Sequence, residues 1–168
     1  MIGAGCDLHT EVERKTRFLM AGIVPGRTAG ESVGVRLAMF SPLPAGARVS
    51  VTHDNGAGFA RHTRLRDGLG MDTYFADPYS SRRRGSNENR NGMIRRYLPK
   101  RSEIQMVMAG ELREIVDEAD NRPMRVLDYR TPAEAFADEL LELQDQQGCC
   151  RTNRGVALLN GSVRPRLT

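Results

Sequence analysis

Asp54 and Glu88 are the acidic residues whose places in the sequence best suit chemistry on a substrate. Asp54 follows the alternating segment Arg48 to His53, which reads as a strand, and open α/β sheets gather functional side chains at strand ends. Glu88 falls in the first turn of a helix that Ser86 is expected to cap. Carboxylate oxygens are the ligands that Mg²⁺ prefers in proteins, so the two residues could hold a divalent cation together.

Polar and basic side chains share the predicted helix face of Glu88. Asn91 and Arg95 recur one and two turns after it. A carboxylate for a metal and an arginine for a phosphate would suit a site that cuts a nucleic-acid backbone. The same residues also have a purely structural interpretation, in which Asp54 makes a turn with Gly56 and Glu88 stabilises a helix N-terminus. Spacing alone leaves both interpretations open.

Length and composition restrict the class of protein. The chain has 168 residues and a mass of 18.7 kDa, which is enough for one ordinary domain. No stretch approaches the roughly 20 apolar residues of a membrane helix, and the N-terminus lacks a secretory pattern, so we expect a cytoplasmic protein. Its three cysteines, of which Cys149 and Cys150 are adjacent, match neither a disulfide framework nor a zinc site.

Charge is divided into blocks along the chain. Residues 48–101 carry 12 basic and 5 acidic side chains, whereas residues 102–145 carry 4 basic and 12 acidic ones. The basic block contains the triplet Arg82 to Arg84, which favours a polyanion such as nucleic acid as partner. A solvated basic face balanced by the acidic block is the alternative, and charge alone does not decide between them.

The order of predicted elements is that of an α/β fold, a mixed sheet flanked by helices. In chain order we expect strands at 11–14 and 17–24, a helix capped by Thr28, a strand at 48–53, a short helix at 61–68, a strand at 71–76, a helix from Ser86, a helix ending at 121–123, and a last helix from Thr131 to about Leu143. The aromatic residues Tyr74, Phe75, Tyr79 and Tyr97 could stack on bases, but core packing is the expected environment of most of them.

Several motifs resemble the catalytic core of transposases of the insertion sequence thirty family, part of the DDE transposase and integrase group. They are VERKTRFLMAGIVPGRTA, then VTHDNGAGFARH, GLGMDTYFADPYSSRRRGSNENRNGMIRRYLPK and ADNRPMRVLDYRTPAEAF. The resemblance covers roughly Val12 to Phe136. It implies an RNase H-like fold in which Asp-Asp-Glu carboxylates hold two Mg²⁺ (or Mn²⁺) ions and act on DNA.

The resemblance also assigns individual residues. Asp54 matches the second aspartate of the family and Glu88 its glutamate, so both are expected catalytic and metal-binding residues. Insertion-sequence ends and target DNA are the expected partners, together with self-association of the chain. The expected DNA contacts are Arg82, Arg83, Arg84, Asn91 and Arg95.

Departures from the family pattern predict a truncated copy with impaired catalysis. The family's first aspartate would fall just upstream of Met1, Asp7 lies past that position, and the family's helix-turn-helix region has no counterpart, so the first strand is expected to be missing or incomplete. The expected divisions are a partial catalytic core at 1–100, its C-terminal helices at 101–143 and a poorly ordered tail at 144–168. A non-catalytic DNA-binding remnant and an RNase H-like nuclease are the alternatives.

Overall fold

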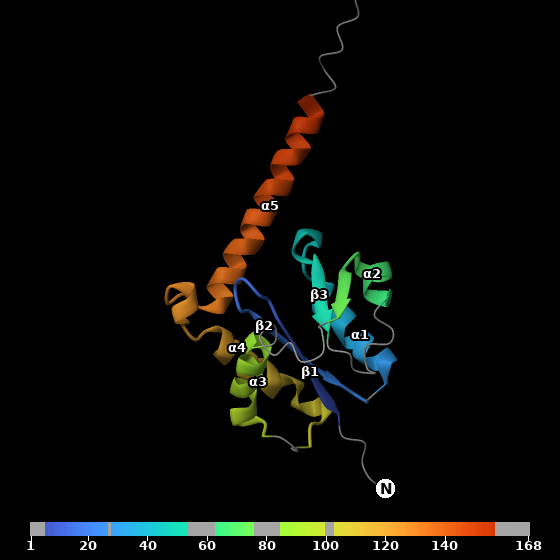
Figure 1. The fold of residues 1–168 in the computed structure, drawn as a ribbon, viewed down its shortest axis with the longest axis vertical. Helices are drawn as coiled ribbons and strands as arrows, with labels where there is room; N and C mark the ends of the chain where they lie inside the picture. Colours follow the sequence, from blue (N-terminus) through green and yellow to red (C-terminus); the bar gives the residue numbers. More distant parts are fainter. Residues whose placement is uncertain (1–5, 27, 54–62, 76–84, 100–102, 157–168) are drawn as a thin grey trace, which may run out of the picture.

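A computed structural model describes residues 6–26, 28–53, 63–75, 85–99 and 103–156 (Figure 1). Four strands and five α-helices alternate in the α/β manner that the sequence predicts. They are β1 (Asp7–Val12), β2 (Leu19–Val24), α1 (Ala29–Phe40), β3 (Ser50–His53), α2 (Thr63–Leu69), β4 (Asp72–Phe75), α3 (Gly85–Tyr97), α4 (Ala109–Asp120) and α5 (Pro132–Val156). In this part of the chain, no helix is both long enough and apolar enough to cross a membrane.

The first two strands form an antiparallel hairpin whose register runs from Asp7 opposite Val24 to Val12 opposite Leu19. The predicted strand boundaries were wrong, since β1 begins at Asp7 and ends before Glu13. The carboxylate of Glu13 accepts hydrogen bonds from the backbone N–H and the hydroxyl of Thr16, at 2.5 and 2.6 Å. These bonds hold residues 13–18 in a turn, so this segment is not available to extend either strand.

Strands β3 and β4 form a separate parallel pair, with Ser50 opposite Asp72 and His53 opposite Phe75. Within the described residues, the strands of the predicted mixed sheet form two small sheets of two strands each, one antiparallel and one parallel. Two sheets result because, among the described strands, β1 pairs only with β2 and β3 pairs only with β4. The α/β class itself is confirmed.

A glycine allows α1 to pack closely on β2. A Cβ at Gly22 would lie only 2.6 Å from Val35 Cγ1 of α1, far inside van der Waals contact. Any larger side chain at this point of β2 would push the helix away from the hairpin. The close approach therefore requires glycine at position 22.

Two apolar clusters hold the elements that carry the predicted site residues. The first joins β2, α3 and α4 and contains Leu19, Ile23, Ile94, Leu98, Leu112, Ile115 and Ala119. The second contains Phe40, Val51, Leu65 and Met71, and so joins α1, β3, α2 and the start of β4. Helix α3 and strand β3 are consequently positioned by different parts of the core.

Helix α5 departs from its predicted end. Thr131 and Glu134 form the expected capping contacts, in which the Glu134 N–H donates to Thr131 Oγ1 at 3.2 Å and the Thr131 N–H donates to Glu134 Oε2 at 2.9 Å. The helix continues past Leu143 to Val156 and extends away from the rest of the fold (Figure 1). Residues just after Leu143, such as Gln144, are good helix formers and no proline stops them.

Candidate active site

Strand β3 leads directly to Asp54 and presents alternate residues to the core. Val51 and His53 are buried, whereas Ser50 and Thr52 are exposed. Asp54 itself lies outside the described residues, so its convergence with Glu88 stays a prediction. The structure does define which residues hold β3, the strand before Asp54, in place.

His53 is held by a buried arginine of α1. Arg36 is 0% exposed, and its Nη1 donates to His53 Nε2 at 3.0 Å, while its Nε donates to the backbone carbonyl of Ser32. Burial lowers the pKa of the Arg36 guanidinium, and the charge of Glu11 opposes that shift. The imidazole of His53 must therefore present an unprotonated nitrogen to Arg36.

Glu11 of β1 connects the two sheets through the same histidine. Its Oε1 lies 2.9 Å from His9 Nε2 and 3.9 Å from His53 Nδ1. The charged groups of Arg36, on α1, and Glu11, on β1, thus both lie next to the buried imidazole ring of His53. This cluster of ionisable residues links α1, β1 and β3 immediately before Asp54, and no pattern in the sequence indicated it.

Glu88 lies in the first turn of α3 and its side chain is exposed. A carboxylate in this position is favoured by the partial positive charge of a helix N-terminus. One turn later, Asn91 contacts the hairpin, because Thr10 Oγ1 of β1 donates to Asn91 Oδ1 at 2.7 Å. Asn91, one turn after Glu88, therefore lies beside β1.

Two of the five predicted DNA contacts, Asn91 and Arg95, lie within the described residues. Arg95 is exposed in the last turn of α3, where its guanidinium is free to meet a phosphate. The amide oxygen of Asn91 is already bonded to Thr10, so this residue also has a structural role. Arg82, Arg83 and Arg84 lie outside the described residues.

Arg90 of α3 has a structural role that the sequence motifs did not predict. It is 1% exposed, it forms an ion pair with Asp120 of α4, and its Nη1 donates to the Ala119 carbonyl at 3.0 Å. Burial lowers the pKa of its guanidinium. A signal was present in the sequence, because Arg90 precedes Ile94 by four residues and so belongs to the apolar face of the helix.

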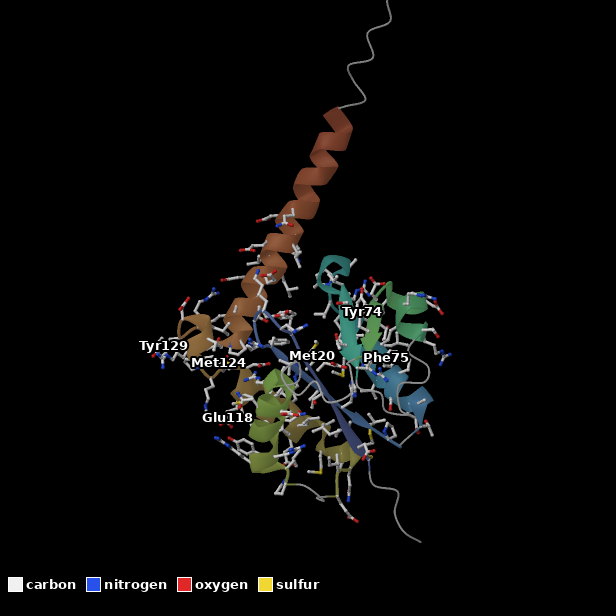
Figure 2. All side chains as sticks on the ribbon, viewed as in Figure 1. Met20, Tyr74, Phe75, Glu118, Met124 and Tyr129 are labelled. Atoms are coloured by element: carbon white, nitrogen blue, oxygen red, sulfur yellow. The ribbon has the colours of Figure 1, made fainter. Side chains whose placement is uncertain are left out.

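The aromatic residues predicted for the core are largely outside it. Tyr74 and Phe75, at the end of β4 (Figure 2), are 56% and 41% exposed. Tyr97 of α3 is 48% exposed. The hydroxyl of Tyr97 donates to Glu118 of α4 at 2.5 Å, which accounts for its place at the surface. The part of the chain that the structure describes contains no group of three or more His, Cys, Asp or Glu suited to a metal.

Comparison with solved structures defines the class of fold. The catalytic core domain of BIV integrase matches 84% of this chain and 90% of its own length with a TM-score of 0.61 at 18% identity. A chain of the simian T-cell lymphotropic virus intasome matches 77% of this chain and 47% of its own length, also with a TM-score of 0.61, at 19% identity. The fold is that of an RNase H-like integrase catalytic core.

Comparison with curated sequences then gives the family. The transposase of insertion sequence element IS1086 from Cupriavidus metallidurans is 33% identical over 135 residues, which are 80% of this chain and 40% of that protein. The transposase InsI of element IS30A from Escherichia coli is 38% identical over 130 residues, which are 76% of this chain and 33% of that protein. No protein-family model matches the chain.

Over these residues the chain is similar to transposases of the insertion sequence thirty family, as its motifs indicate. It spans 40% of the Cupriavidus metallidurans relative and 33% of the Escherichia coli relative. The resemblance noted in the sequence is therefore confirmed, and so is the fold that it implies.

Proposed function

We propose that this chain is the catalytic-core part of a DDE transposase, which cuts and joins DNA during transposition. The observation that carries the proposal is its similarity to insertion-sequence transposases over 76–80% of its length. Its fold, which matches the catalytic core domain of BIV integrase, agrees with this proposal. Insertion-sequence ends and target DNA are the proposed substrates, and self-association is part of the proposal because these reactions join separate DNA ends.

Asp54 and Glu88 are the proposed catalytic residues and would hold Mg²⁺ or Mn²⁺. Hard carboxylate oxygens suit these cations, and the exposure of Glu88 on the first turn of α3 leaves it accessible to a solvated ion. When bound, the metal would activate the attacking oxygen and neutralise charge at the scissile phosphate. Asp54 and Glu88 would orient the cation. Strand β3 would support Asp54, which follows it in the sequence, and helix α3 carries Glu88.

Basic residues would bind the DNA backbone beside these carboxylates. Arg95 supports this proposal because it is exposed two turns after Glu88 on the same helix. Arginine binds phosphate through paired N–H donors, which also orients the strand. The complete proposed set is Arg82, Arg83, Arg84, Asn91 and Arg95.

A manganese titration followed by electron paramagnetic resonance tests the metal site. We expect the purified chain to remove free Mn²⁺ from solution, and Asp54→Asn or Glu88→Gln each to reduce the bound fraction. Asp67→Asn and Glu114→Gln are matched controls, because both carboxylates are exposed on other helices, and they should bind Mn²⁺ like the original chain. Equal binding by all five proteins would refute the proposed ligands.

Product analysis on labelled DNA separates the proposed reaction from its alternatives. We expect joined strands whose formation requires metal and both carboxylates. Cleaved but never joined strands would instead indicate a nuclease. DNA binding that survives both substitutions, with neither product, would indicate a binding module without catalysis.

A further inference from the structure

The buried carboxylate of Asp120 connects β2, α3 and α4. Both oxygens of Asp120, at the end of α4, lie 3.1 Å from the Leu19 N–H, which donates to them at the start of β2. Oδ1 also pairs with Arg90 Nη2. Arg90 and Asp120 are 1% and 2% exposed, so water does not compete for these bonds.

A second contact, made by Nη1, fixes the direction of the Arg90 side chain. Its Nη1 donates to the Ala119 carbonyl at 3.0 Å, so the guanidinium is held both by a side chain and by the backbone of α4. Apolar packing around it, which includes Ile94 and Ala119, is less directional. A hydrophobic face can slide or turn by a fraction of a residue, whereas a two-point guanidinium contact requires one geometry.

The rotation of α3 determines where Glu88 lies. With about 100° per residue, Arg90 is roughly 200° round the helix from Glu88, and Asn91 is within about 60° of it. When Arg90 points into the core, Glu88 must therefore lie on the outer side of α3. The exposure of Glu88 and the contact of Asn91 with Thr10 agree with this arrangement.

The geometry points to Arg90 as a positioning residue, whose ion pair with Asp120 sets the rotation of α3 and so holds Glu88 in its place at the surface. The role of Glu88 rests on the proposed function, but the position of its side chain does not. Asp120 acts with Arg90, because it links the same helix to β2 and α4.

A cross-link between β1 and α3 tests this inference without metal or DNA. In a background carrying Thr10→Cys and Asn91→Cys, a short bifunctional thiol reagent should join the two introduced side chains, which replace groups 2.7 Å apart. Peptide mass spectrometry identifies this product among those of the native cysteines. We expect Arg90→Met, and the double variant Arg90→Met with Asp120→Asn, to slow the cross-link about fivefold or more.

Two further variants separate rotation from loss of stability. Arg90→Lys keeps a buried cation and should restore part of the cross-linking rate. Ile94→Ala removes buried packing from the same helix and should lower the urea midpoint while leaving the rate unchanged in the folded state. The inference is overturned if Arg90→Met cross-links as fast as the background, or if Ile94→Ala slows the reaction equally. Loss of Mn²⁺ binding by itself would bear on the proposed function alone.

Discussion

Buried charged side chains set the geometry around the candidate site at the scale of single residues. Arg36 contacts His53, the residue immediately before Asp54. Arg90, two residues after Glu88, contacts Asp120. Removing one partner of a buried ion pair such as Arg90–Asp120 usually costs about 3–5 kcal/mol, because the other charge is left uncompensated. Residues beside the two proposed ligands are thus more tightly constrained than the exposed surface.

Glu13 gives a pH-dependent prediction. Burial alone would raise the pKa of its carboxyl, but hydrogen bonds from Lys15 and Thr16 outweigh burial and hold it below its ordinary value of 4.5. Its contribution to stability is therefore complete above about pH 4.5 and is lost as the pH falls through the lowered pKa. Glu13→Gln should destabilise the fold at neutral pH, and the difference from the original chain should shrink in acid.

Urea unfolding from neutral pH down to about 3 measures this effect. Glu114→Gln, which replaces an exposed carboxylate of α4, serves as the control and should change the free energy of unfolding little at any pH. A constant difference between Glu13→Gln and the original chain across the whole range would contradict the prediction.

Helix starts are the elements most directly encoded in this sequence. Thr28 and Glu31 form a complete capping box on α1, and Thr131 and Glu134 cap α5, as the spacing of each pair predicts. Strand limits were harder to predict, as β1 shows, because they depend on a partner strand and on the turn that Glu13 stabilises.

Removing the cap of α1 should have a measurable cost. Thr28→Ala deletes the hydroxyl that accepts from the Glu31 N–H at 3.3 Å, and the expected loss is about 1 kcal/mol of unfolding free energy. Ser32→Ala lies in the same helix without a capping role and should be neutral or slightly stabilising. Denaturant unfolding compares the two variants, and equal effects would exclude the capping contribution.

The charge blocks act at the scale of the whole molecule. The exposed arginines of α3 belong to the basic block, whereas Arg113, the one arginine of α4, belongs to the acidic block. A proposed DNA contact should therefore lie on α3 and not on α4. This distinction can be measured because each phosphate contact releases bound counterions.

DNA affinity measured over a range of salt concentrations tests the position of this surface. Arg95→Gln should weaken binding and reduce the steepness of the plot of log affinity against log salt by about one unit. Arg113→Gln, an equally exposed arginine of α4, should leave that slope unchanged. The proposed surface would be wrong if both substitutions changed the slope alike.

The sequence by itself determined the α/β class, the similarity to insertion-sequence transposases and the helix caps, because motifs and caps depend on residues close together in the chain. It also predicts Asp54 and Glu88 as metal ligands. Only the tertiary structure decided that Arg36, His53 and Arg90 are buried, since each is enclosed by elements distant in sequence. It also decided that the strands form two separate pairs. Burial and strand pairing depend on which surfaces meet, and a local pattern does not specify that.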